Sequence, residues 1–144
     1  MNNEAILNIV EKQRRFFYSG RTLDVNFRIR ALKKLKSCIE DNEEQINKAL
    51  LSDLGKSGFE SYMCETGLVL SELSYMIKHT EKLSREKTVY TPLAQFHSRS
   101  FVKPSPYGTV LVMSPWNYPF LLSMDPAVDA IAAGNTVVLK PSAY

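Results

Sequence analysis

Residues 109–119 read TVLVMSPWNYP, and this segment sets the architecture expected for the whole chain. It begins with a continuous apolar run that is rich in β-branched side chains and too short for a buried helix. Such a run predicts a buried parallel strand. The prolines that follow, Pro115 and Pro119, end the strand and bracket a short, stiff turn. A second apolar run, Thr136-Val137-Val138-Leu139, predicts another buried strand.

A helix is expected between the two strands, from about residue 119 to residue 133. Proline suits the first turn of a helix, and Gly134-Asn135 supplies its end. A strand, a crossover helix and a second strand make a parallel βαβ unit. Because two parallel strands have little cover for their apolar faces, we expect that the sequence is cut short and that the open sheet edge self-associates.

The residues before this unit are predicted to form three helices, because their apolar side chains recur at helical spacing. The first ends at Ser19-Gly20, the second runs from a cap at Asp24 to Gly55, and the third begins at Ser57. The apolar stripe of the third helix is expected to lie in the core. Its members are Phe59, Tyr62, Met63, Thr66, Val69, Leu70, Leu73, Met76 and Ile77.

Composition agrees with a folded protein. Of 144 residues, 44% are hydrophobic and 23% are charged, which is the balance of a globular chain rather than a disordered one. We expect an α/β protein with a helical region over residues 1–87 and an incomplete parallel-sheet domain over residues 88–144. No basic segment precedes an apolar run near Met1, and no apolar stretch reaches the roughly 20 residues of a membrane span. We therefore expect a cytoplasmic protein without a signal peptide or a membrane span.

Charged and metal-ligating residues give no separate function. The net charge of +3 does not by itself indicate nucleic acid. A cation-rich stretch is expected to be a solvated helix face; it holds Arg28, Arg30, Lys33, Lys34 and Lys36. Cys38 and Cys64 are expected to be reduced, inert core thiols. His79 and His97 have no partners at metal-ligand spacing, so no metal site is expected.

The candidate site follows from the strand ends. Ligands of open α/β sheets bind outside the carboxyl ends of the strands, which selects residues 114–117 and 140–142. The amide of Asn117, held by the flanking prolines, could donate a hydrogen bond to an oxygen that gains negative charge. Lys140 precedes a proline and is therefore extended, so its ammonium could meet ribose hydroxyls or a phosphate.

Two longer segments around these loops resemble a known family. Residues 112–120, VMSPWNYPF, and residues 130–142, AIAAGNTVVLKPS, closely resemble the start of the Rossmann-like cofactor domain of aldehyde dehydrogenases. The segments SGRT at 19–22, DLGK at 53–56 and FESY at 59–62 are similar to the helical lead-in of the class-three-like branch. The resemblance runs over nearly the whole chain. It implies the amino-terminal part of an NAD- or NADP-dependent enzyme that forms homo-oligomers and oxidises an aldehyde to a carboxylate.

The resemblance also implies roles for individual residues. Asn117 matches the amide that stabilises the oxyanion of a cysteine thiohemiacetal, and Lys140 matches the lysine that binds the adenosine ribose. Cofactor contacts are implied for Ser114, Pro115, Trp116, Asn117, Lys140 and Ser142. Tyr62 matches a tyrosine of the substrate-tunnel wall.

Some family features are not in this sequence. Ala143 stands where family members commonly have a ribose-binding glutamate, and the nucleophilic cysteine, general base and Gly-rich turn belong to later motifs. We therefore expect residues 1–144 alone to be inactive. Two other functions stay open: a short non-catalytic product that docks to a full-length subunit, and a basic helical module that binds nucleic acid.

Overall fold

A computed structural model describes residues 3–143. Its helices are α1 Asn3–Tyr18, α2 Val25–Asp41, α3 Glu43–Leu54, α4 Gly58–Ser61, α5 Gly67–Leu83 and α6 Leu121–Ala132. A π-helical segment, Tyr62–Thr66, joins α4 to α5, and short 3-10 turns lie at Arg21–Leu23 and Leu93–Gln95. The strands are β1 Lys87–Thr88, β2 Phe101–Val102, β3 Thr109–Met113 and β4 Thr136–Lys140. No helix of the described residues is long and apolar enough to cross a membrane.

The predicted strand–helix–strand unit is present. β3 and β4 pair in parallel, with Thr109 opposite Thr136 and Met113 opposite Lys140, and α6 connects them. The two strands start together because the side chain of Asn135 accepts a hydrogen bond from the amide of Gly108 at 2.9 Å. The parallel pairing and the connecting helix are therefore confirmed.

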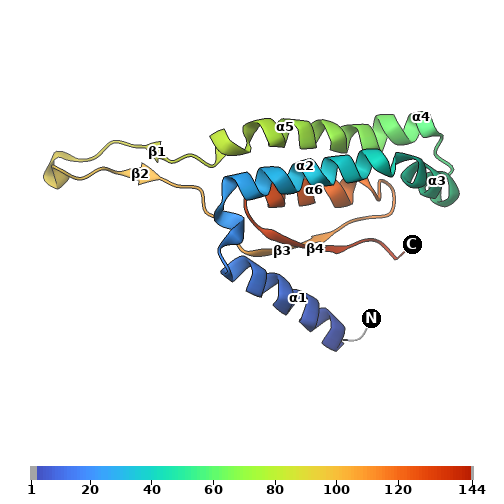
Figure 1. The fold of residues 1–144 in the computed structure, drawn as a ribbon, viewed down its shortest axis with the longest axis horizontal. Coiled ribbons are helices and arrows are strands. Elements are labelled where there is room, and N and C mark those ends of the chain that lie inside the picture. The colour runs from blue at the N-terminus through green and yellow to red at the C-terminus, as the bar shows by residue number, and fades with distance from the viewer. Residues whose placement is uncertain (1–2, 144) are drawn as a thin grey trace.

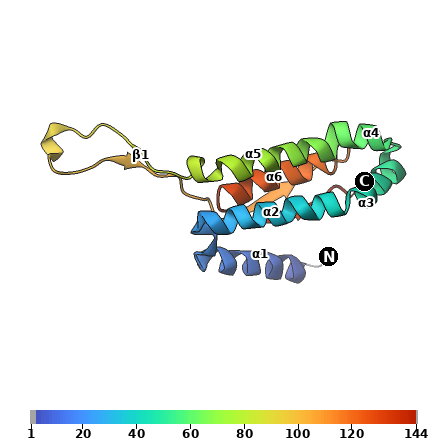
Figure 2. The same cartoon turned by 45° about the horizontal axis from the view of Figure 1, so that its top comes forward.

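The elements stack in layers. α1 contacts one face of the β3–β4 pair and α6 covers the other (Figure 1). α2 and α5 pack on the far side of α6, and a hairpin made of β1 and β2 projects away from the layers (Figure 2). α6, which belongs to the second half of the chain, thus packs against helices from the first half. The division into two regions between residues 87 and 88 stays a prediction.

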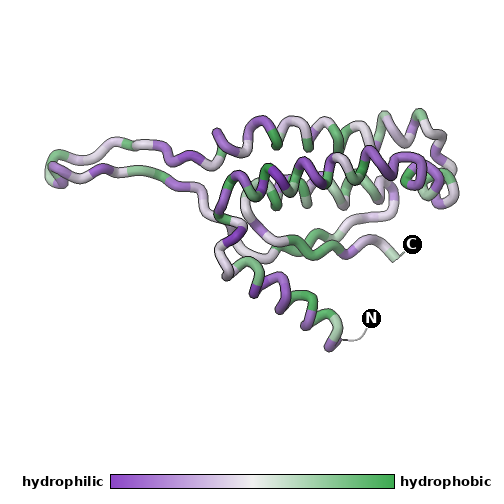
Figure 3. The backbone as a smooth tube through the Cα atoms, in the orientation of Figure 1, coloured by the Kyte–Doolittle hydropathy of each residue, from purple (hydrophilic) through white to green (hydrophobic). Residues whose placement is uncertain are grey.

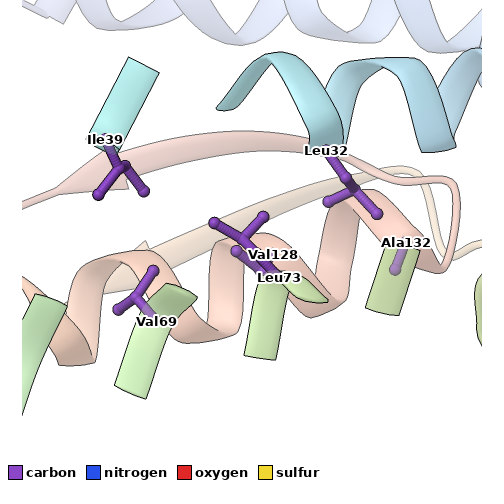
Figure 4. Close-up of a cluster of buried hydrophobic side chains, with 6 residues drawn as sticks. All are labelled: Leu32, Ile39, Val69, Leu73, Val128 and Ala132. Carbon is purple, nitrogen blue, oxygen red and sulfur yellow. The ribbon is translucent and has the colours of Figure 1, made fainter. Parts of the chain in front are cut away.

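The core lies between α2, α5 and α6. Its buried members, drawn in Figure 4, are Leu32, Ile39, Val69, Leu73, Val128 and Ala132. These side chains recur four or seven residues apart on their own helices, so each helix turns one apolar stripe into this core. Hydrophobic and hydrophilic residues alternate along the helices (Figure 3). Burial of these stripes is the main apolar contribution to the stability of the fold.

The strands are less buried than the sequence predicts. Val112 is buried, but Met113 is 70% exposed, and Leu111 and Leu139 are exposed as well. The reason is visible in Figure 1, where α1 diverges from the strands toward its own N-terminal end and leaves part of one face uncovered. The predicted self-association through the sheet stays a prediction.

Several helix ends were predicted correctly. The carboxylate of Asp24 accepts from the amide of Asn26 at 2.9 Å, and Ser57 Oγ accepts from the amide of Glu60 at 3.2 Å. Gly20 and Gly55 both adopt positive φ angles, of 75° and 69°, at the helix ends where glycine was expected.

The single helix predicted from Asp24 to Gly55 is wrong, because Asn42 divides it into α2 and α3. The side-chain amide of Asn42 donates to the carbonyl of Cys38 at 2.7 Å. This bond competes with the regular helical pattern and lets the chain turn. Cys38 is exposed and Cys64 is half-buried, so their assignment to the core is also wrong.

Arg28 does not lie on a solvated face as predicted. Its side chain is buried, and its guanidinium donates to the carbonyls of Thr22, Leu23 and Ala132. Burial lowers the pKa of Arg28, while the nearby carboxylate of Asp24 opposes that shift. Arg28 therefore ties the start of α2 to the end of α6.

The prediction that the start of the third helix lies in the core is also wrong. Phe59 is 78% exposed, and Tyr62 and Met63 are exposed too. The π-helical segment changes the helical phase between α4 and α5, so that Glu65 is buried there beside Thr66, whose predicted burial is confirmed.

Candidate functional site

The two predicted loops meet at one edge of the sheet. The amide of Ser114 donates to the carbonyl of Lys140 at 3.3 Å, directly beyond the paired ends of β3 and β4. Pro115, Trp116 and Asn117 are exposed just beyond β3, while Lys140 ends β4 with its side chain exposed. The structure therefore brings these predicted residues together at the carboxyl ends of the strands. Ser142 follows on the same side, half-buried.

Ser114 anchors the first end of the loop. It is buried, and its Oγ lies 2.6 Å from Ser123 Oγ, in the first turns of α6. Ser123 Oγ itself donates to the carbonyl of Pro119 at 2.6 Å. Since a serine has one hydroxyl proton, Ser114 is the donor to Ser123. This chain of hydrogen bonds closes the loop back onto its own helix.

A buried ion pair anchors the second end of the loop. Lys56 Nζ lies 2.5 Å from Glu65 Oε1, and the two side chains are 9% and 0% exposed. Lys56 also donates to the backbone carbonyl of Asn117 at 3.1 Å. Its ammonium lies 4.1 Å from the centre of the Tyr118 ring, which is close enough for a cation–π interaction.

Glu65 completes this arrangement at the start of α6. Its Oε2 accepts hydrogen bonds from the amides of Phe120 at 2.8 Å and Leu121 at 3.2 Å. These are free amides of the first turn of α6, which has no capping side chain of its own. A carboxylate is favourable there because the N-terminus of a helix carries partial positive charge.

Lys56 and Glu65 were missed by the sequence reasoning. Glu65 lies three residues after Tyr62 and four before Val69, at helical spacing from two members of the predicted apolar stripe. A charge on an apolar stripe is rarely buried without a partner, so it was a usable signal. The identity of that partner was not readable, because Lys56 precedes the turn and Asn117 is far along the chain.

Tyr62 lies on the same π-helical segment as Glu65. Its ring packs over Gly67, where an added Cβ would come within 3.1 Å of the ring. The absence of a side chain at Gly67 therefore gives the Tyr62 ring its place. Helical segments of this kind are common at functional sites.

The exposed groups define what this edge can bind. Asn117 offers an amide donor, Lys140 a cation, and Trp116, 57% exposed, a flat aromatic surface. Together they suit a ligand that carries hydroxyl or phosphate groups and a planar ring. Among residues 3–143, no three His, Cys, Asp or Glu side chains are grouped so as to hold a metal ion.

Comparison with known sequences matches the whole chain to one family. A profile of the aldehyde dehydrogenase family matches residues 1–144. The chain is 42% identical over 140 residues to the 4,4'-diaponeurosporen-aldehyde dehydrogenase of Staphylococcus aureus, covering 94% of this chain and 30% of that protein. It is 41% identical over 133 residues to aldehyde dehydrogenase family 3 member B3 of Mus musculus, covering 92% and 28%. The chain thus spans about 30% of the length of these relatives.

Solved structures agree. The fold superposes on substrate-bound AldH of Staphylococcus aureus with a TM-score of 0.93 at 42% identity, covering 99% of this chain and 31% of the other. It superposes on the NAD⁺ complex of an aldehyde dehydrogenase from Bacillus cereus with a TM-score of 0.81 at 25% identity, covering 92% and 26%. An NADP complex of glyceraldehyde-3-phosphate dehydrogenase from Methanocaldococcus jannaschii shares the fold at 21% identity, with a TM-score of 0.85 and coverage of 99% and 30%.

Proposed function

Since the chain belongs to the aldehyde dehydrogenase family, in its class-three-like branch, we propose that it forms the amino-terminal part of an enzyme that oxidises aldehydes to carboxylates with NAD or NADP. The observation that carries this proposal is the state of Asn117. Its backbone carbonyl is held by a buried ammonium, while the residue itself is exposed at the carboxyl edge of the parallel strands. A donor held in this way is suited to stabilise developing charge.

Asn117 has the central role among the residues of this chain. In the proposed reaction a cysteine from another part of the enzyme attacks the aldehyde carbonyl, whose oxygen becomes an oxyanion. The Asn117 amide donates a hydrogen bond to that oxygen. Because the amide is already oriented, little reorganisation is needed when the charge develops. Tyr62 is proposed to line the path of the aldehyde.

The cofactor is proposed to bind along the strand ends. When bound, a nicotinamide cofactor would supply the acceptor for the hydride that leaves the former aldehyde carbon. In this proposal Lys140 would hold the ribose hydroxyls with Ser142 beside it, and Ser114, Pro115 and Trp116 would line the nicotinamide side; the exposed ammonium of Lys140 and the exposed Trp116 support it. β3, α6 and β4 would then be the first parallel unit of a Rossmann-like domain that begins near residue 88.

The other two functions are less well supported. Burial of Arg28 removes a cation from the surface on which a nucleic-acid site would depend. A docking role without catalysis does not explain why an ion pair is buried beneath the loop of Asn117.

We propose in addition that the enzyme is a homo-oligomer.

The test is a direct assay of the full-length enzyme. Absorbance of NADH or NADPH is followed with an aliphatic aldehyde, with wild-type enzyme and with the 144-residue chain alone. The proposal expects aldehyde-dependent reduction by the full-length enzyme and none by the chain alone. A full-length protein that binds no cofactor and reduces none with any of a panel of short, long and aromatic aldehydes would contradict it.

A further inference from the structure

We propose that Lys56 and Glu65 are positioning residues for Asn117, acting together as a buried clamp on the backbone of the loop that carries it. The inference rests on the proposed function and extends it to two residues outside the strand-end loops. Both side chains are buried, so neither is placed to touch a substrate at the strand ends. Their effect on the reaction is therefore transmitted through the loop.

The clamp holds three backbone atoms close together in sequence. Lys56 binds the carbonyl oxygen of Asn117, and Glu65 binds the amide nitrogens of Phe120 and Leu121. Because Lys56 and Glu65 also bind each other, these contacts form one connected unit. The unit fixes the carbonyl side of Asn117 relative to the first turn of α6.

The opposite end of the loop is fixed independently. Ser114 binds Lys140 through its amide and Ser123 through its hydroxyl. The prolines at 115 and 119 further limit the backbone between these anchors. The Asn117 side chain thus projects from a loop that is tied at both ends, which reduces the motion that would misplace its amide.

The charges of the clamp match each other. The ammonium of Lys56 has the carboxylate of Glu65, the carbonyl of Asn117 and the ring of Tyr118 as partners. Glu65 uses one oxygen for Lys56 and the other for the two amides. Removing one partner leaves a buried charge, so a single substitution tests folding as well as positioning.

The decisive variant therefore removes both charges. Lys56→Met with Glu65→Leu keeps the volume apolar and leaves no buried ion, a change that proteins often accept without loss of stability. We expect the double variant of the full-length enzyme to fold and to bind NAD(P) with little change. Its kcat should fall about 10- to 100-fold, because displacing a catalytic group by about 1 Å lowers the rate by up to about that factor.

A double-mutant cycle with Asn117→Ala separates positioning from general stability. If the clamp acts through Asn117, removing the clamp in the Asn117→Ala background should lower kcat by less than about threefold further. The matched control makes the same changes in an exposed pair, Lys48→Met with Glu44→Leu, whose ion pair on α3 measures 2.6 Å. It should leave kcat within about twofold of wild type.

Hydrogen exchange gives a readout that does not depend on activity. In the clamp double variant, the amides of Phe120 and Leu121 should exchange at least about tenfold faster, while that of Val128, deeper in α6, is unchanged. Unchanged exchange at Phe120 and Leu121, or full additivity with Asn117→Ala, would overturn the inference. If wild-type enzyme is inactive but the exchange result holds, the proposed function fails and the clamp on the loop stands.

Discussion

The guanidinium of Arg28 packs against the bare Cα of Gly134, where α6 ends and the turn into β4 begins. A Cβ on Gly134 would lie 2.7 Å from Cζ of Arg28, closer than side chains approach one another. Gly134 also has a φ of 95°, which favours glycine. This contact lets Arg28 reach the carbonyl of Ala132 at 3.3 Å and Ser84 Oγ at 3.2 Å. One glycine therefore permits a link between α2, α5 and α6.

Gly134→Ala should be destabilising. The positive φ alone costs of the order of 1–3 kcal/mol for a residue with a side chain, and displacement of Arg28 adds to that cost. Urea unfolding measured by circular dichroism checks the change. Gly58→Ala is the matched control, because a Cβ there meets nothing within 4 Å, and its stability should be equal to wild type or slightly higher. Equal stabilities for Gly134→Ala and wild type would show that Arg28 moves aside freely.

Lys56→Met should lower the stability of the fold by about 3–5 kcal/mol, because it leaves the carboxylate of Glu65 buried without its cation. The double variant Lys56→Met with Glu65→Leu should recover most of that loss. Chemical denaturation of both variants beside wild type measures the difference. A double variant as unstable as the single one would mean that the hydrogen bonds of Glu65 to α6, rather than the charge balance, dominate its contribution.

The parts of the fold that could be predicted from sequence are those that neighbouring residues determine. The strands beginning at Thr109 and Thr136 and the caps at Asp24 and Ser57 depend on neighbouring residues, so local patterns identify them. The strand-end rule then places Asn117 and Lys140 at one edge. The positions of Asn117 and Lys140 could therefore be predicted from sequence, while their roles stay predictions.

The remaining features depend on distant residues. The clamp joins Lys56 to a carbonyl 61 positions away and Glu65 to amides 55 and 56 positions away. Arg28 likewise reaches a carbonyl 104 positions along the chain. Neither pairing follows from spacing, because both depend on how the helices pack. The same applies to the division at Asn42, where a single side-chain hydrogen bond outweighs a continuous apolar stripe.

Stability should depend on pH through a group of carboxylates between α5 and α6. Burial raises the pKa of Glu72 from its ordinary 4.5, with further contributions from Asp129 and Asp125, and burial likewise raises the pKa of Asp125. A raised pKa means that the protonated form stabilises the fold. That contribution is complete below about pH 4.5 and is lost as the pH rises through the folded-state pKa.

Glu72→Gln should therefore be more stable than wild type at neutral pH, and the advantage should shrink as the pH is lowered toward 4.5. Thermal unfolding of both proteins across this interval provides the measurement. Glu44→Gln, in an exposed ion pair on α3, serves as the control and should show no such gain. An advantage of Glu72→Gln that grows on acidification would reverse the sign and refute the explanation.

Cofactor choice should respond to residue 143. An acidic side chain near the ribose 2′ position accepts a hydrogen bond from NAD and repels the phosphate of NADP. Ala143 is exposed two residues after Pro141 and provides neither effect, while Lys140 keeps its cation nearby. We expect the full-length enzyme to use NADP at least comparably to NAD, and Ala143→Glu to shift kcat/KM toward NAD. A strong wild-type preference for NAD that Ala143→Glu leaves unchanged would place residue 143 away from the ribose.

The role of Asn117 as an oxyanion donor is the centre of the proposed function. The most direct measurement is kcat of the full-length enzyme with Asn117→Ala, with cofactor affinity and thermal stability determined on the same sample. An amide that acts mainly on the oxyanion predicts a loss of about 10²–10³ in kcat, with a smaller change in cofactor binding and near-wild-type stability. A kcat within about twofold of wild type, or a loss explained by unfolding, would instead make Asn117 a residue of the turn alone.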